Sequence, residues 1–334
     1  MLKAIFGIPP SREYNIFVKI PGLSKKNLII SVSLIVLVLL IILLKTTSKE
    51  TFEALKSAQP SYLFLALLAW ISYVFFDGLR FTLASLSIGE HKLNLLTAIK
   101  VITVGIFLAA VSPFQVAGLP VQIMLLNKRK IGLGRSTALL AARGFIGYLT
   151  ILIAVLISLK YIWPPPSGIV RGIIIYTTIL VAGIFLLYSV ALFLPNLLKK
   201  ILKSDRIIKE IFSLRETTIA FVKSSDKKIL LLAMLSSFAS HLSICLIPFF
   251  LSYSFNSPIG FGRAFSFQSL IQGGLLWTPT PGGTGIAESV GYFFFKDFMN
   301  QEILGIFVIV WRFFTHHFAA VVGAIFLLRE LREI

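Results

Sequence analysis

Three ionisable residues lie within apolar sequence and could act on a charged molecule: Arg143, Glu288 and Arg312. Ionisable side chains are costly inside a membrane, and they usually face a partner or a polar pathway. The two arginines could hold a phosphate through fork-shaped hydrogen bonds. Glu288 could pair with one of them or with a cationic headgroup, or it could take up a proton. The alternatives are a purely structural salt bridge at Glu288 and, for Arg143, snorkelling to the nearby membrane surface.

A segment rich in proline and glycine immediately precedes Glu288. Its residues are Pro281, Gly282, Gly283 and Gly285. The flanking apolar runs, 264–277 and 289–295, are each too short to cross a bilayer, because a helical crossing needs ~20 residues. Non-helical backbone at membrane depth survives only inside protein or beside a wet cavity. A broken or re-entrant hairpin around a site is therefore predicted at about 264–295.

Other polar residues in apolar sequence have a simpler expected role. Gln268 and Gln272 approach the break and could line a cavity, or they could hydrogen-bond to neighbouring helices. His316 and His317 are adjacent and point about 100° apart on a helix, so they cannot chelate one metal together. Packing or hydrogen bonding is expected for them, and His241 is expected to be a satisfied core histidine. No metal ion or other cofactor is expected.

The composition is typical of a polytopic membrane protein. The chain has 334 residues, of which 57% are hydrophobic and only 14% charged, and its mean hydropathy is +0.90. The single cysteine excludes an internal disulfide and a thiolate cluster. The net charge of +18 comes from basic residues in loops between apolar spans, which favours anionic lipid over nucleic acid as partner. No nucleotide-binding loop is present, which argues against direct ATP drive.

The apolar spans predict an all-α fold with about six full transmembrane helices. They run at 27–44, 61–76, 137–159, 169–194, 229–253 and 303–328. We expect one transmembrane domain at 27–328, preceded by a basic arm at 1–26 and followed by a tail at 329–334. The connection at 195–228 places apolar residues at helical spacing among basic ones, which predicts an interfacial amphipathic helix. Asp77 and Arg80, three residues apart, are expected to pair on one helix face at the cytoplasmic boundary.

Lysine and arginine distribution predicts the topology. The amino terminus, the loop at 127–135 and the connection after 194 are basic and are therefore expected in the cytoplasm. If the loops around Gly89 and Lys130 are both cytoplasmic, the stretch at 97–126 enters and leaves by one face. Pro113, Gly118 and Gln122 lie at or beside its turn. The hairpin at 264–295 enters from the opposite face. Two opposed broken hairpins suggest an inverted repeat with a midplane site, although such breaks also occur by chance in apolar chains.

The motif at 281–288 resembles the Pro-Gly-Gly-x-Gly-x-x-Glu signature of the lysylphosphatidylglycerol synthase transmembrane family, also called the flippase-like or UPF0104 family. The stretch at 113–126, followed by Gly132 and Arg143, resembles the first motif of that family. Members usually carry Gly-Glu-x-x-Arg where this chain has Gly118 to Gln122, and Glu-Arg where it has Ala142 and Arg143. The resemblance covers nearly the whole chain.

The resemblance implies movement of a phospholipid or glycolipid headgroup across the bilayer, since the membrane part of the fused synthases is the flippase module. The aminoacyl-transferase domain of those synthases is absent, so lipid aminoacylation is not expected. Membrane lipids with anionic or zwitterionic headgroups would be the partners, in the plasma membrane of a prokaryote. An intramembrane enzyme and an accessory subunit in lipid-linked glycan or lipid modification are the alternative functions. Homo-oligomerisation stays open.

Overall fold

The computed structural model describes residues 56, 58–112, 117–162, 168–194 and 205–332. Within these ranges the chain is helical and contains no β-strand. Five helical units there are long and apolar enough to cross a membrane. The predicted class, a polytopic all-α membrane protein, agrees with this architecture.

The long helices match five of the six predicted crossings. Four are single helices: α4 (Pro60–Ser87), α7 (Leu133–Ile162), α8 (Ile169–Phe193) and α11 (Lys227–Ser254). The fifth runs from α14 (Gln301–Arg312) through a π-helical turn, η4 (Phe313–His317), into α15 (Phe318–Arg332). The predicted crossing at 27–44 and the predicted arm at 1–26 lie outside the described residues.

Helix α4 is longer than the sequence predicted. The predicted crossing ends at 76 because two charged residues, Asp77 and Arg80, follow the apolar run, whereas the helix continues to Ser87. The predicted pairing of these two residues is confirmed, so neither is an isolated charge. Pro60 begins the helix, where its missing amide donor has no intrahelical partner to lose.

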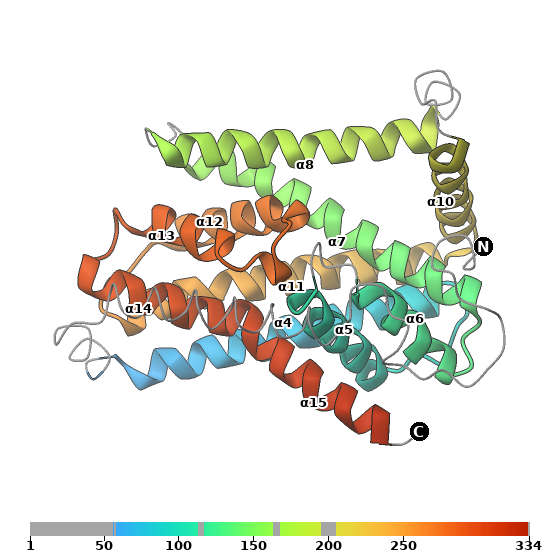
Figure 1. Ribbon diagram of the computed structural model, residues 1–334, viewed down its shortest axis with the longest axis horizontal. Coiled ribbons are helices and arrows are strands. Elements are labelled where there is room, and N and C mark those ends of the chain that lie inside the picture. The colour runs from blue at the N-terminus through green and yellow to red at the C-terminus, as the bar shows by residue number, and fades with distance from the viewer. Residues whose placement is uncertain (1–55, 57, 113–116, 163–167, 195–204, 333–334) are drawn as a thin grey trace.

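Helices α4 and α11 lie antiparallel and side by side (Figure 1). At one end the amide of Gln59, just before α4, donates to the carbonyl of Ser254 at 2.9 Å. At the other end the amide of Asp226 donates to the carbonyl of Ser87 at 2.6 Å. The Asp226 side chain also caps α11 by accepting from the amide of Lys228. These contacts fix both ends of the pair, so that residues far apart in sequence face each other along it.

Two stretches form pairs of short helices instead of long crossings. The first contains α5 (Leu95–Ala110) and α6 (Gly118–Lys128), and residues 113–116 between them lie outside the described part. The second contains α12 (Phe261–Gly274), two 3₁₀ turns (Leu275–Trp277 and Pro281–Gly283) and α13 (Ile286–Phe295). These stretches include the two predicted hairpins at 97–126 and 264–295. In the second stretch the helix is broken where the proline and glycines occur, and in the first Gly118 begins α6.

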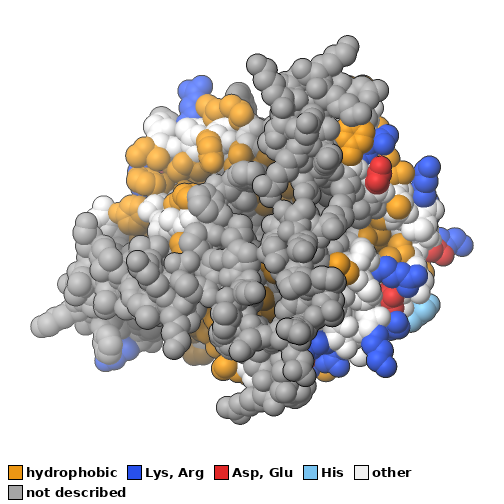
Figure 2. Space-filling model, turned by 45° about the vertical axis from the view of Figure 1, so that its right-hand side comes forward, with side chains coloured by type: hydrophobic (Ala, Val, Ile, Leu, Met, Phe, Trp, Pro, Cys, Tyr) orange, Lys and Arg blue, Asp and Glu red, His pale blue; other side chains and the backbone are white. Residues whose placement is uncertain are grey.

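Two apolar clusters fill the interior. The larger one joins α12, α13 and α14 to parts of α4, α7, α8 and α11, and the smaller one surrounds α5 and α6. Large hydrophobic side chains are exposed along α4, α7, α8 and α11, as expected for helices that face lipid. Figure 2 shows such side chains on the face that it draws, together with a region rich in Lys and Arg.

The carboxyl end of α15 is held by a cluster of basic residues. The carboxylate of Glu330 lies 3.1 Å from Nη2 of Arg129 at the end of α6, and Lys100 and Lys128 lie within 4 Å of it. Helix α10 (Asp205–Ser224) occupies the predicted amphipathic connection and packs on α7 and α8. Its contact with lipid stays a prediction.

Candidate functional site

A buried ion pair joins the second broken stretch to the long helix that follows it. Nε of Arg312 donates to Oε1 of Glu288 at 3.1 Å, and the two side chains are only 5% and 2% exposed. Nη2 of Arg312 donates to the carbonyl of Gly282. The second carboxylate oxygen of Glu288 accepts from the amide of Gly285 at 2.7 Å, at the start of α13. We call Gly282, Glu288 and Arg312 the Glu288–Arg312 lock.

The backbone of the lock requires glycine. Gly282 has a φ of 58°, in the left-handed region that other residues rarely adopt. A Cβ at this position would lie 2.5 Å from Nε2 of His316 and 3.1 Å from the Cα of Ala110. Ala110 is the last residue of α5. The turn at Gly282 in the second stretch therefore lies against the carboxyl end of α5 in the first stretch. Pro281 begins this turn, and Gly283 and Gly285 also have positive φ.

The other predicted site residues in the second stretch mainly connect helices. Gln268, which is buried on α12, accepts a hydrogen bond from Nε1 of Trp311 at 2.8 Å. This fits the interhelical alternative better than a cavity-lining role. Gln272 is half-buried on the same helix. His241 shares a 2.9 Å hydrogen bond with Ser269, which confirms the prediction of a satisfied core histidine.

The predicted residues of the first stretch hold α5 and α6 together. Nε2 of Gln122 donates to the carbonyl of Val101 at 3.1 Å. Gly118 lies against Gly105, where a Cβ would come within 2.9 Å of the Gly105 carbonyl oxygen. Pro113 lies outside the described residues. The close approach of the two helices therefore depends on small residues and one interhelical hydrogen bond.

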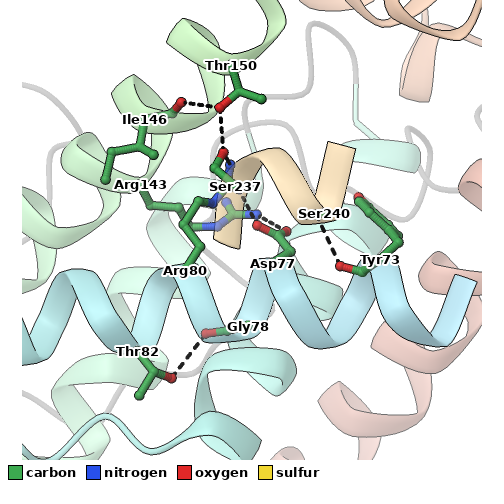
Figure 3. A network of polar contacts seen from close by, with 10 residues as sticks. All are labelled: Tyr73, Asp77, Gly78, Arg80, Thr82, Arg143, Ile146, Thr150, Ser237 and Ser240. Atoms are coloured by element: carbon green, nitrogen blue, oxygen red, sulfur yellow. Dashed lines mark hydrogen bonds and ion pairs between the residues drawn. The ribbon is translucent and has the colours of Figure 1, made fainter. Parts of the chain in front are cut away.

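A second group of charges lies where α4, α7 and α11 meet (Figure 3). Asp77 binds two arginines at once: Nη2 of Arg143 lies 2.6 Å from its Oδ2, and Nη2 of Arg80 contacts its Oδ1. Nη1 of Arg80 also donates to Oγ of Ser237 at 2.9 Å, and Ser237 shares a 2.7 Å hydrogen bond with Thr150. We call Asp77, Arg80 and Arg143 the Asp77 centre. Arg143 thus turns to an interior carboxylate rather than snorkelling.

Comparison with known proteins places the chain among polytopic membrane proteins of one family. The family described as lysylphosphatidylglycerol synthase TM region matches residues 28–323. The chain belongs to this family. A UPF0104 membrane protein of Archaeoglobus fulgidus is 25% identical over 296 residues, which cover 84% of this chain and 90% of that protein. The resemblance predicted from the motif at 281–288 is therefore confirmed.

Two features of this family member were not predicted from its sequence. Asp77 was assigned to Arg80 alone, because helical spacing shows only neighbours on the same helix. His316 and His317 lie in a π-helical turn, and the Nε2 atom of each is buried without a hydrogen-bond partner among the described residues. Hydropathy carries no signal for either feature. The π-helical turn is of interest because such turns are frequent at functional sites.

Proposed function

We propose that this family member moves a phospholipid or glycolipid headgroup across the bilayer, as a flippase or scramblase, through a site near the midplane. The observation that carries the proposal is the contact between Gly282 and Ala110, which brings the broken stretch against the end of α5 inside the protein. Broken helices buried in this way can offer backbone amides and carbonyls to a polar guest at membrane depth.

The two short-helix pairs would be opposed re-entrant hairpins in an inverted repeat. Each pair contains glycine beside its break, and each is followed by a long helix with a largely buried arginine, Arg143 on α7 and Arg312 on α14. Such repeats allow one bundle to rock against the other about a fixed site. The basic loops favour a cytoplasmic amino terminus, and a prokaryotic plasma membrane suits the family.

The Glu288–Arg312 lock would close the break and release it during each transport cycle. Arg312 donates a hydrogen bond to the carbonyl of Gly282, and Glu288 accepts one from the amide of Gly285. Separation of the ion pair would free both backbone groups for a headgroup. The glycines and Pro281 would let the turn change shape, since their backbone is not committed to a continuous helix. An anionic or zwitterionic headgroup could bind these groups while its acyl chains stay in lipid.

Headgroup-labelled fluorescent phospholipids in proteoliposomes test the proposal. Dithionite destroys the label in the outer leaflet, so the rate at which inner-leaflet signal is lost reports translocation. We expect the unmodified protein to accelerate this loss, and Glu288→Gln and Arg312→Gln to slow it at least ~10-fold, equivalent to about 1.4 kcal/mol. Glu302→Gln is the matched control, because Glu302 is an exposed acid in the first turn of α14.

The assay should include an anionic phospholipid, a zwitterionic phospholipid and a glycolipid. Correct folding of every variant should first be checked by size exclusion. If the folded protein accelerates the translocation of none of these lipids, the proposal is rejected. The enzyme and accessory-subunit alternatives then take its place. If the protein is an accessory subunit, Glu288→Gln should leave the cellular process that it supports unchanged.

A further inference from the structure

The Asp77 centre carries an excess of positive charge. The guanidinium groups of Arg80 and Arg143 share the single carboxylate of Asp77, which leaves one positive charge without a counter-charge in this group. The side chains that extend the network, Ser237 on α11 and Thr150 on α7, are neutral hydroxyls. A charge in a largely apolar interior is costly unless an opposite charge compensates it. The centre therefore favours an additional anion.

Two hydrogen-bond donors of the centre are also unused. The Nε atoms of Arg80 and Arg143 are buried and have no hydrogen-bond partner in the described part of the chain. Arg80 uses both Nη atoms, for Asp77 and Ser237, and Arg143 uses Nη2 for Asp77. A guanidinium donates in a planar fork whose geometry matches the oxygens of a phosphate. The unused donors are thus of the type that phosphate binds.

Arg143 forms the accessible side of the centre. Its side chain is 20% exposed, compared with 11% for Arg80 and 4% for Asp77. Gly147, about one turn further along α7, gives the Arg80 guanidinium its space, because a Cβ there would lie 2.6 Å from Nη1. Figure 3 shows the side chains of Asp77, Arg80 and Arg143 converging from α4 and α7. An anion would therefore approach the centre from the side of Arg143.

We propose that the Asp77 centre binds the phosphate of a lipid headgroup through the Nε–H groups of Arg80 and Arg143. Asp77 orients the two guanidiniums through their Nη2 atoms, and both Nε–H donors stay unused. The inference rests on the proposed function and narrows its substrates to lipids that carry a phosphate. Lipids with uncharged, phosphate-free headgroups would not bind here.

Binding to the purified full-length protein in detergent tests the inference separately from translocation. The probes are dihexanoylphosphatidylglycerol, dihexanoylglycerol, which lacks the phosphate, and inorganic phosphate, each titrated by calorimetry. The phospholipid should bind, and dihexanoylglycerol should not. Arg143→Gln should weaken phospholipid binding at least ~10-fold, because a charge-assisted hydrogen bond is lost. Arg135→Gln, which removes the exposed partner of the buried Glu90 carboxylate, should leave it unchanged.

Asp77→Asn provides a change in the opposite direction. It removes the negative charge that repels a phosphate and keeps one oxygen acceptor, while one of the two arginines loses its acceptor. Phospholipid affinity should therefore rise in the folded variant, a result that misfolding cannot produce. Equal binding of dihexanoylglycerol and phospholipid, or full affinity in a folded Arg143→Gln protein, would overturn the inference. Binding of inorganic phosphate without binding of the phospholipid would overturn its lipid part. If phosphate-dependent binding is found but no lipid is translocated, the proposed function fails and the phosphate site stands.

Discussion

The two buried arginine centres differ in their balance of charge. At the Glu288–Arg312 lock one guanidinium meets one carboxylate, and a further donor binds the carbonyl of Gly282. At the Asp77 centre two guanidiniums share one carboxylate, and two Nε–H donors are unused. The lock is thus internally satisfied, whereas the Asp77 centre has capacity for an anion. Burial of an arginine alone does not identify a ligand site, but the charges and donors around it do.

The largest loss of stability should come from removing one of the two charges of the Glu288–Arg312 lock. Glu288→Gln leaves the Arg312 charge buried without a counter-charge, which should destabilise the protein by ~3–5 kcal/mol. Thermal unfolding in detergent, followed by size exclusion after heating, measures the loss. The double variant Glu288→Gln/Arg312→Gln removes both charges and should recover most of it. A double variant that is no more stable than Glu288→Gln would show that charge balance is not what holds this joint.

Gly282→Ala should have the next largest effect, because it changes the backbone on which the lock closes. The left-handed φ of 58° and the clash with Ala110 and His316 should together cost ~1–3 kcal/mol. Gly260→Ala is the matched control, since Gly260 has a φ of −63° and open space around its Cβ position. The same unfolding assay separates the two variants. Equal stability of both would mean that the contact between the two short-helix pairs is not tight.

Sequence alone predicts what depends on local pattern. Apolar runs of sufficient length predict five described crossings, and the proline and glycine residues around Gly282 predict where a helix breaks. The Asp77–Arg80 pair follows from helical spacing. Each of these features requires only residues that are close in the chain. The family follows from the motif at 281–288, which is also a local pattern.

What the sequence does not show depends on how helices rotate and pack. Arg143 lies 66 residues from Asp77, and their pairing requires α4 and α7 to face each other with the correct rotation. The link between Gln268 and Trp311 needs the same information for α12 and α14. For Glu288, the sequence left several partners open, and only the packing of α13 against α14 selects Arg312. Hydropathy gives the existence of helices but not their relative rotation.

Neutralising one arginine of the Asp77 centre should be far milder than unbalancing the lock. Arg143→Gln removes the excess charge and leaves Arg80 paired with Asp77, so the cost should be about 1 kcal/mol, that of one lost hydrogen bond. Unfolding temperatures of Arg143→Gln and Glu288→Gln, measured side by side, check this contrast. An equally severe loss in Arg143→Gln would mean that the centre has no excess charge and that an unidentified counter-charge completes it.

The smallest effect on stability is expected at a third arginine–carboxylate pair, between Glu90 in the loop after α4 and Arg135 in the first turn of α7. Burial tends to raise the pKa of the Glu90 carboxyl, but hydrogen bonds from Arg135 and from the amide of Lys92, together with the nearby positive charges, lower it below its ordinary 4.5. Because the folded pKa is the lower one, the stabilisation is present above pH 4.5 and is lost as the pH falls through the folded value.

Arg135 is 64% exposed, so screening by solvent should limit the contribution of this pair to about 0.5 kcal/mol. Glu90→Gln should remove that component of the acid sensitivity, which a comparison of unfolding temperatures at neutral pH and below pH 4.5 measures. A change as large as that of Glu288→Gln would contradict the premise that an ion pair contributes more when both of its side chains are buried. The three arginine pairs together separate two effects. Exposure of the arginine distinguishes the Glu90–Arg135 pair from the lock, and charge balance distinguishes the Asp77 centre from the lock.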